Sequence, residues 1–331
     1  MVSFFFSSSS SNESKIRIRF DFSISLADNG LESHIFLWFN HLNIMIPHPL
    51  DKEYKYLKLS IPSQSSGLVI VALNRPRKRN ALSSEMWKEI GSAFGRLGRS
   101  GDGCRCIILT GVGKAFTAGI DVMDKKFFSF TNDDNGSNDK ARIGLAFLPQ
   151  IMQMQNCFTA VEKCPVPVIA AIHGSCIGAG IDLACCCDIR LASTSTTFSV
   201  REVKIGLAAD IGTLQRLPKI TGNDSRVREL CYTGGNFNHH EALEIGFVSR
   251  ISRNPLDDAI QLGMRIAENS PVAVTGTKHS LLYSRDHGVG DGLEHIASHN
   301  ALALMTQDIP NAFMARKEKP VFADMLPQSR L

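Results

Sequence analysis

The chain has 331 residues, of which 44% are hydrophobic and 21% are charged. This composition is ordinary for a globular protein with one large domain or two smaller ones. The net charge of +4 is too small, and the basic residues are too scattered, to indicate nucleic-acid binding. The apolar runs are shorter than the roughly 18 residues of a membrane-spanning helix, so we expect no membrane span.

The first 50 residues differ from the rest of the chain. They include the serine-rich, low-complexity run "SFFFSSSSSNES". Such a composition is typical of a disordered or transit-like extension. We therefore expect an extension over residues 1–50, a folded core over 51–255 and a helical region over 256–331.

Strands and helices are predicted to alternate through the core. "YKYLKLSIP" and "GLVIVALNRP" read as a strand pair, followed by a helix that Ser83 or Ser84 caps, with Met86, Ile90 and Phe94 on one face. "CRCIILTG", "PVIAAIHG" and "DIRLAST" read as buried strands, separated by helices over 141–163 and 178–187. This alternation predicts an α/β fold. From about residue 222 the strand signal fades, and helices are predicted over 255–269 and 271–284.

The cysteines and histidines show no metal-binding spacing. The nine cysteines lie mostly inside apolar segments without a CxxC pair, and the ten histidines include no HExxH motif. Buried free thiols in a reducing compartment are the simpler interpretation. We therefore expect no metal site.

Two junctions between a strand and a glycine are candidates for substrate contact. They are "GKAFTAGIDVM" and "HGSCIGAGID". Small residues at such turns let the backbone approach a ligand, and free N–H groups there can hold a negative oxygen. Neither junction fits a nucleotide-binding motif. Tight packing of a helix on a sheet is the alternative interpretation for either junction alone.

Three acids follow the second junction: Asp182, Glu202 and Asp210. Carboxylates in apolar surroundings have raised pKa values and exchange protons near neutral pH. The alternative for each is a surface acid or a helix cap, and Asp210 is placed to cap a helix that begins near Ile211. By contrast, Asp188 in "CDIR" lies near Arg190 and reads as structural.

Four segments together resemble the enoyl-CoA hydratase/isomerase (crotonase) superfamily: "LNRPRKRNAL", "GVGKAFTAGIDV", "PVIAAIHGSCIGAGIDLACCCDIRLAS" and "FSVREVKIGLAADIGTLQRLPKITG". The resemblance runs from about residue 54 to the C-terminus. It implies a crotonase-like α/β fold of repeated ββα units, with a catalytic core over 51–255. It also implies that the helical region over 256–331 forms homotrimers, which often pair as homohexamers.

The resemblance further implies a site for a fatty acyl-CoA. Its oxyanion hole would consist of the backbone N–H groups of Ile120 and Ala179, where relatives often have glycine in place of Ala179. Because the donor is a backbone group, alanine serves as well. Coenzyme A would enter as the substrate thioester, without a cofactor or metal. The residues expected to line the thioester site are Ala118, Gly119, Ile120, Asp121, Val122 and Ala179.

The acids select a branch of the family. Hydratases are expected to have glutamates at the positions of Asp182 and Glu202, whereas here the first is aspartate and Asp210 adds a third acid. This set resembles the Δ3,5-Δ2,4-dienoyl-CoA isomerases of fatty-acid β-oxidation. It implies a proton shuttle by Glu202 and Asp210, with Asp182 in support. Which acid serves C2 and which serves C6 stays open. The alternatives are a 2-enoyl-CoA hydratase and a non-catalytic acyl-CoA-binding member.

The last three residues, Ser329, Arg330 and Leu331, are a variant of the Ser-Lys-Leu signal that the peroxisomal import receptor reads. We therefore expect a peroxisomal protein. The serine-rich N-terminus gives mitochondria as the alternative.

Overall fold

The computed structural model describes residues 45–63, 67–99, 101–127, 139–316 and 318–327. These residues belong to one unit, Asn43–Leu331, which is described here by itself. The predictions for residues 1–44 and for the tripeptide Ser329 to Leu331 lie outside the described residues.

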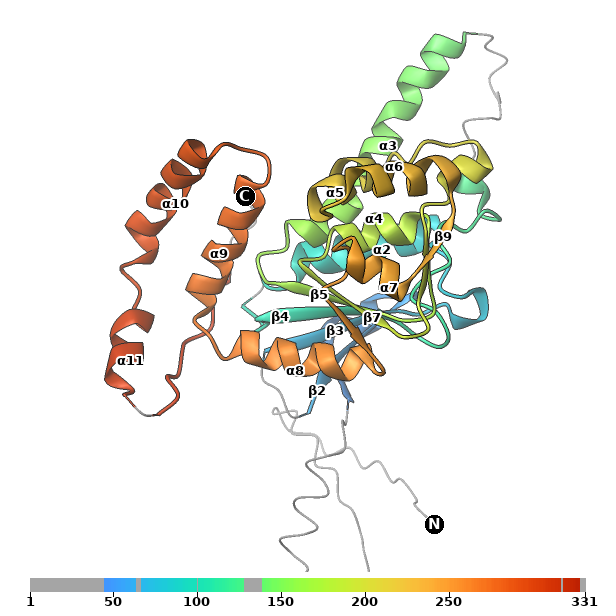
Figure 1. Ribbon diagram of the computed structural model, residues 1–331. Helices are drawn as coiled ribbons and strands as arrows, with labels where there is room; N and C mark the ends of the chain where they lie inside the picture. The colour runs from blue at the N-terminus through green and yellow to red at the C-terminus, as the bar shows by residue number, and fades with distance from the viewer. Residues whose placement is uncertain (1–44, 64–66, 100, 128–138, 317, 328–331) are drawn as a thin grey trace, which may run out of the picture. The chain divides into compact units, whose positions relative to one another are not determined.

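A mostly parallel sheet forms the centre of this unit (Figure 1). Within the described residues it has the strand order β1-β2-β3-β4-β5-β7-β10. The first three strands pair antiparallel, as the predicted strand pair requires, and the others pair parallel. The strands are β1 (Met45–Pro47), β2 (Leu57–Pro62), β3 (Leu68–Leu73), β4 (Cys106–Gly111), β5 (Val168–Ile172), β7 (Ile189–Ser193) and β10 (Arg250–Ser252).

A second, smaller sheet consists of β6 (Ser175–Ile177), β8 (Thr197–Ser199) and β9 (Asn236–Asn238). The chain enters it repeatedly from the larger sheet. After β5 it forms β6 and then helix α4 (Ala179–Cys185), and after β7 it forms β8 and later α5 (Thr213–Ile220). These are the expected ββα units, and each one carries the chain past the end of the parallel sheet.

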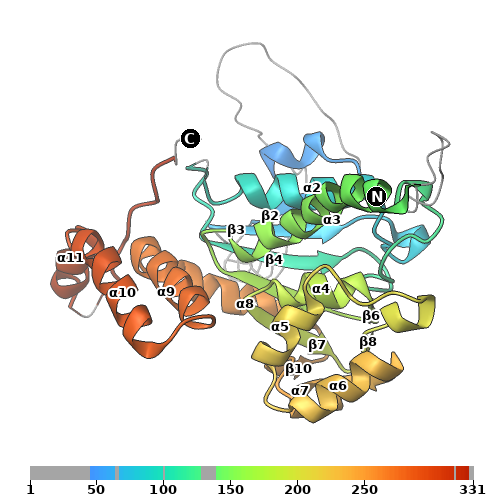
Figure 2. The same ribbon diagram turned by 90° about the horizontal axis from the view of Figure 1, so that it is seen from above.

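Alternate residues of the central strands face two separate cores, as the two-residue period of a strand requires. Val69 and Ile107 point to the side covered by α2 (Ser84–Arg96) and α3 (Lys140–Glu162). Leu68 and Ile108 point to the other side, which α8 (Pro255–Ala267) covers. Figure 2 shows α2 and α3 side by side along one face of the sheet, and Figure 1 shows α8 on the opposite side of the sheet. The sheet is therefore buried on both faces.

The remaining helices are α6 (Asp224–Thr233), α7 (His239–Glu244), α9 (Pro271–Ser284), α10 (Val289–Ala303) and α11 (Asp308–Met314), besides the 3-10 turns η1 (Pro49–Glu53), η2 (Pro76–Lys78) and η4 (Glu202–Ile205). Of these, α9 and α10 lie side by side, and α11 follows them (Figures 1 and 2).

A buried ion pair fixes α9 to the core. Nζ of Lys278 lies 2.7 Å from Oδ2 of Asp188 and donates to the carbonyl of Val166 at 2.9 Å. Asp188 is thus structural, as predicted, but its partner is Lys278 from a distant helix. The guanidinium of Arg190 instead donates to backbone carbonyls, including that of Phe247 at 2.6 Å.

Three expectations about elements need correction. Residues 45–50 belong to the folded part, because β1 pairs with β2, although we expected the extension to end at residue 50. Strands β9 and β10 occur after residue 222, and their three residues each are too short to show alternation. Helix α5 begins at Thr213 with Gly212 as its N-cap, so Asp210 caps no helix.

Candidate active site

Within the described residues, the N–H of Ile120 has no acceptor because of how its segment meets the turn before α2. In the parallel bridge between Leu82 and Ile120, Leu82 donates to the carbonyl of Gly119 at 2.8 Å and accepts from the N–H of Asp121 at 2.9 Å. In such a bridge the N–H of the middle residue points away from the partner strand. Among the described residues, Ile120 therefore has no acceptor for its N–H.

Ala179, the second predicted donor, is the first residue of α4, so its N–H has no acceptor within the helix. The chain turns into the helix at Gly178, whose φ of 53° favours glycine. The two donor segments touch: a Cβ built on Gly119 would lie 2.7 Å from the carbonyl oxygen of Ile177 and 3.8 Å from the nitrogen of Ala179. The structure thus brings together the two junctions that the sequence singled out.

Asn80 holds the first junction in place, and the sequence analysis did not identify it. Its buried side-chain amide donates to the carbonyls of Val112 and Ala115 at 2.9 and 2.8 Å. The backbone carbonyl of Asn80 accepts from Oγ1 of Thr117 at 2.7 Å, and the Thr117 hydroxyl accepts from the N–H of Gly119 at 3.1 Å. The only signal available was an asparagine at a turn, a residue type that tolerates the φ of 55° seen here.

Two predicted lining residues differ in their surroundings. Asp121 is buried and paired with Arg75, whose Nη2 lies 2.9 Å from Oδ2. This contact fixes the loop, so the Asp121 carboxylate is engaged with the protein. Val122, by contrast, is exposed and free to contact a ligand.

Glu202, the first residue of η4, lies against the second junction. A Cβ built on Gly178 would be 3.3 Å from Oε1 of Glu202. The other oxygen, Oε2, is buried and has no hydrogen-bond partner among the described residues. Burial raises the pKa of Glu202 to about 7, and the charges of Asp182 and Asp210 act in the same direction. This carboxyl group is thus poised to gain and lose a proton near neutral pH.

Asp182 is almost fully buried in α4, with 1% of its surface exposed. Its Oδ1 accepts from the N–H of Thr213, the first residue of α5, at 2.6 Å. Burial raises the pKa of Asp182 to about 6, which the hydrogen bond to Thr213 opposes and the charge of Asp210 supports. Asp182 therefore connects α4 to α5, and its ionised form is energetically costly because it is buried.

Asp210 is the most exposed of the three acids. Its backbone carbonyl accepts from Nε2 of Gln155 at 2.7 Å, and partial burial raises the pKa of its side chain. Its charge raises the pKa of both Asp182 and Glu202. The three predicted acids therefore share one neighbourhood, next to the two free N–H groups. Three exposed apolar residues lie between Glu202 and Asp210 in the chain, on η4 and the loop that follows: Val203, Ile205 and Leu207.

A group of cations lies beside the first junction and was not among the residues predicted from the sequence. Arg77, Lys78 and Arg79 are exposed in and after η2. The carbonyl of Arg79 accepts from the N–H of Ala118 at 2.9 Å, which places this turn against the Ala118 to Val122 segment. Exposed cations at this point suit a ligand that carries phosphate groups.

The described part of the chain offers little else for a cofactor. It contains no cluster of three or more His, Cys, Asp or Glu side chains arranged to hold a metal ion. All nine cysteines are free thiols, and all but Cys157 are buried. Over the same residues, no helix has both the length and the apolar character to cross a membrane.

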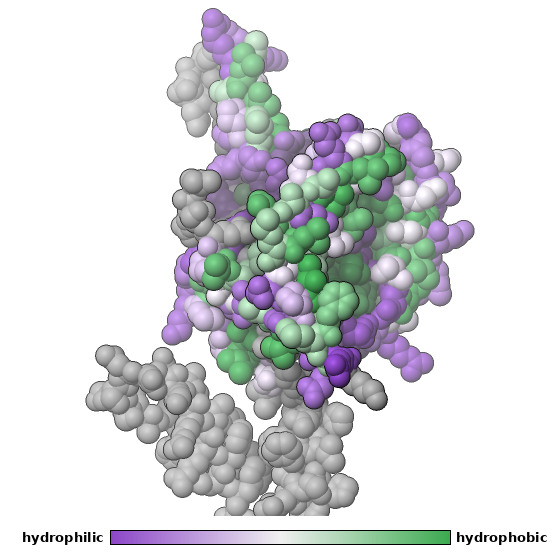
Figure 3. Space-filling model, turned by 90° about the vertical axis from the view of Figure 1, so that its left-hand side faces the viewer, coloured by the Kyte–Doolittle hydropathy of each residue, from purple (hydrophilic) through white to green (hydrophobic). Residues whose placement is uncertain are grey.

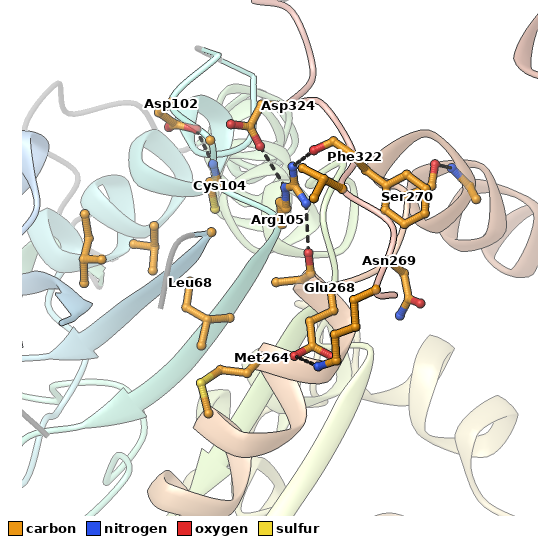
Figure 4. Close-up of a pocket in the computed structure, with 18 of the residues that line it drawn as sticks. Leu68, Asp102, Cys104, Arg105, Met264, Glu268, Asn269, Ser270, Phe322 and Asp324 are labelled. Carbon is orange, nitrogen blue, oxygen red and sulfur yellow. Dashed lines mark hydrogen bonds and ion pairs between the residues drawn. The ribbon is translucent and has the colours of Figure 1, made fainter. Parts of the chain in front are cut away.

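A hollow of about 1010 Å³ lies away from the acids, where β3 and β4 begin (Figure 4). Arg105 stands at its wall, and each side of its guanidinium is engaged. It contacts Oδ1 of Asp324 at 2.8 Å and the carbonyls of Phe322 and Ala267 at 2.6 and 3.0 Å. Arg105 thus holds the segment after α11 to the core, and its charge is not available to a ligand.

Known proteins share both the sequence and the fold. The family described as enoyl-CoA hydratase/isomerase matches residues 63–286. The chain is 45% identical to a human mitochondrial Δ3,5-Δ2,4-dienoyl-CoA isomerase over 80% of this chain and 81% of the relative. It is 39% identical to a peroxisomal enzyme of the same name from Arabidopsis thaliana, over 83% and 99%. The crystal structure of an enoyl-CoA hydratase from Bacillus anthracis superposes with a TM-score of 0.71 at 27% identity, covering 82% of this chain and all of that one. The chain belongs to the enoyl-CoA hydratase/isomerase family.

Proposed function

We propose that the protein is a Δ3,5-Δ2,4-dienoyl-CoA isomerase of unsaturated fatty-acid β-oxidation. Relatives of that name from animals and a plant are 39 to 45% identical over most of the chain. The observation that carries the proposal is Glu202, whose carboxyl group has one buried oxygen and a pKa of about 7 and lies against Gly178. Gly178 directly precedes Ala179, so the carboxyl group lies close to a backbone N–H donor, which is the arrangement needed to remove a proton beside a thioester carbonyl.

The N–H groups of Ile120 and Ala179 would hold the thioester oxygen. They stabilise the negative charge that develops there when a proton leaves C2, and losing one such donor costs about 10²–10³ in rate. Because C2 is bonded to the thioester carbon, the acid nearest this hole serves C2. We therefore propose Glu202 for C2, in the order that the sequence left open.

The electron pair of the C2–H bond then forms the C2=C3 double bond. The C3=C4 pair moves to C4=C5, and the C5=C6 pair takes up a proton at C6. Asp210 would deliver this proton. It is more exposed than Glu202, so solvent can restore its proton after each turnover. The apolar side chains of Val203, Ile205 and Leu207 would contact the hydrocarbon.

Asp182 would act without touching the reacting carbons. Its bond to the N–H of Thr213 fixes the start of α5 and so the segment that carries Asp210. Its charge also raises the pKa of Glu202. Both effects support a shuttle between the other two acids.

Coenzyme A would lie along the first junction. Arg77, Lys78 and Arg79 would contact its phosphates, and the Ala118 to Val122 segment would line the thioester arm. The isomerisation as written needs only the carboxyl groups and the two backbone donors, so we propose that it proceeds without a cofactor.

We also propose that the region after the sheet assembles the protein into trimers or hexamers. α8 packs on the sheet, so the assembly region would begin with α9 at Pro271. In Figure 3, where this side faces the viewer, hydrophobic residues run through the middle of the face between hydrophilic ones. The large exposed apolar residues of α9–α11 and their connections are Leu281, Val289, Leu293, Leu302, Leu304, Met305, Ile309, Phe313 and Met314. Sedimentation equilibrium tests this proposal, and a monomer at micromolar concentration would contradict it.

The compartment is proposed from the sequence and from the relatives. The terminal tripeptide Ser329 to Leu331 favours peroxisomes, and the plant relative is named as peroxisomal. The human relative is named as mitochondrial. Imaging the full chain with and without its last three residues distinguishes the two compartments, since only peroxisomal import depends on that tripeptide.

An ultraviolet assay tests the function directly. Purified protein is given a 3,5-dienoyl-CoA and, separately, a 2-enoyl-CoA. We expect rapid growth of the absorbance of the conjugated 2,4-dienoyl thioester and slow loss of the 2-enoyl thioester. Fast hydration without the diene would instead identify a hydratase, and turnover of neither would identify a non-catalytic acyl-CoA-binding protein.

A further inference from the structure

The segment Asp210–Thr213 carries the proposed C6 acid, and three side chains from other places hold its backbone. Nε2 of Gln155 in α3 donates to the carbonyl of Asp210 at 2.7 Å. Nη1 of Arg216 in α5 donates to the carbonyl of Ile211 at 3.3 Å. Oδ1 of Asp182 in α4 accepts from the N–H of Thr213 at 2.6 Å. The backbone at the Asp210 carboxylate is therefore fixed from three helices.

Arg216 also determines the path of the segment by its volume. Its guanidinium lies directly over Gly212, where a Cβ would be 1.8 Å from Nη1. Gly212 has a φ of 136°, which L residues with a side chain rarely adopt. The guanidinium of Arg216 can therefore occupy this position only because residue 212 has no side chain.

The guanidinium itself is held by a carboxylate from α3. Nε and Nη2 of Arg216 lie 3.0 and 3.1 Å from the two oxygens of Glu162, and Nη2 also lies 3.2 Å from Oγ1 of Thr159. Both charged side chains are about nine-tenths buried. Such a two-point contact fixes orientation as well as distance. Arg285, at the end of α9, adds a third contact to Glu162 at 2.5 Å.

We propose that Arg216 is a positioning residue for the isomerisation. Held by Glu162, its guanidinium fixes Ile211 and Gly212 so that the carboxyl group of Asp210 faces C6 of the substrate. Arg216 touches neither substrate nor reacting atoms. This inference rests on the proposed function, because it assigns Asp210 to the C6 proton.

A double variant, Glu162→Gln with Arg216→Gln, tests the role. Removing Arg216 alone would leave the buried Glu162 carboxylate with only Arg285 to offset its charge, so both charges of the Arg216–Glu162 pair are removed together. We expect kcat to fall about 10²-fold, as for a misplacement of about 1 Å, with KM within about threefold of the wild type. Exchange of the C2 proton in D₂O should persist, since Glu202 and the two N–H donors are unchanged. Lys219→Gln is the matched control, because Lys219 is an exposed cation on the same helix.

Amide hydrogen exchange at Thr213 gives a readout that does not depend on activity. We expect faster exchange in the double variant and none of this change in Lys219→Gln. Unchanged kcat and unchanged exchange at Thr213 would overturn the positioning role. So would a parallel loss of C2 exchange and isomerisation, which indicates general damage to the site. If the wild type fails to isomerise the diene, the proposed function fails, and exchange at Thr213 still decides whether Arg216 fixes the segment.

Discussion

Gly178 and Glu202 are in contact, since a methyl group on Gly178 would lie 3.3 Å from Oε1 of the glutamate. One residue further along the chain, Ala179 presents its free N–H. The proposed base therefore lies against the turn that presents the N–H of Ala179. A methyl group on Gly178 would require the carboxylate or the turn to shift by a few tenths of an ångström.

We therefore expect Gly178→Ala to lower kcat, because Glu202 or the turn must shift by a few tenths of an ångström from its present position. Gly178 has φ 53° and ψ −122°, which lies outside the left-handed helical region, and a side chain there adds about 1–3 kcal/mol of backbone strain. Gly206→Ala is the comparison for a positive φ without a contact, because Gly206 has φ 81° and ψ 17° and nothing lies within 4 Å of its added methyl. Steady-state kinetics and urea unfolding of both variants separate strain from contact. Equal loss of activity in the two variants would contradict the role of the contact.

Glu202→Gln and Asp210→Asn should both cut isomerisation by about 10²–10⁴ while acyl-CoA binding persists. They should differ in D₂O. Glu202→Gln removes the base at C2, so exchange of the C2 proton should disappear with turnover. Asp210→Asn leaves that base in place, so C2 exchange should continue. Mass spectrometry of the recovered substrate measures this, and the reverse pattern would exchange the two assignments.

The isomerisation rate should fall as pH rises through about 7. The shuttle needs one proton on the pair formed by Glu202 and Asp210, and the pKa of Glu202 is raised to about 7. Burial is the main cause of this value, and the charge of Asp210 adds to it. Above it the pair loses its last proton and none is left for C6. Initial rates of kcat/KM at constant ionic strength measure the decline, and a profile that stays flat to pH 9 would contradict it.

Asp182 should make stability depend on pH. Its folded-state pKa is raised to about 6 from an ordinary value of 3.8, so its contribution to stability is complete below pH 3.8 and lost as pH rises through 6. At alkaline pH the ionised form costs about 3 kcal/mol. Asp182→Asn removes this charge and keeps an oxygen that can accept from the N–H of Thr213. Its gain in unfolding free energy over the wild type should therefore be about 1.4 kcal/mol larger at pH 8 than at pH 5.

Urea unfolding at the two pH values measures that difference, with Glu294→Gln on exposed α10 as the control. A gain that is the same at both pH values would show that Asp182 does not carry the titration. Activity should fall in Asp182→Asn even where stability rises. Such a result is common where an active site keeps a buried charge for its chemistry.

Local sequence signals predicted the elements well. Ser83 caps α2 through the N–H of Met86, and the buried face includes Ile90 and Phe94, as the helical period indicates. The glycines of the two junctions likewise marked the places where the backbone leaves the sheet. These features depend on residues within a few positions of one another, so a single sequence carries them.

Contacts between distant segments were not predictable in this way. Asp182 accepts from Thr213, 31 positions away, and Lys278 lies 90 positions from Asp188. The nearer candidates failed: Asp210 does not cap α5, and Arg190 does not pair with Asp188. Only the packing of helices on the sheet decides these partners. That the three acids lie near one another was expected from the sequence, whereas the contacts that hold them were not.

Asn80 is such a holding residue, and Asn80→Gly isolates its hydrogen bonds. Glycine adopts the φ of 55° without strain but raises the entropy of the unfolded chain, which the control Arg316→Gly also does. The buried carbonyl of Ala115 and the partly buried carbonyl of Val112 would lose their partner, which destabilises by about 1–3 kcal/mol for a buried group. Because the same loop leads to Ile120, kcat should fall by a larger factor than the factor by which KM changes. Arg316→Gly, at a φ of 49° on the exposed end of α11, should leave kcat unchanged. A stability loss in Asn80→Gly with unaltered kcat would show that Ile120 is positioned by other contacts.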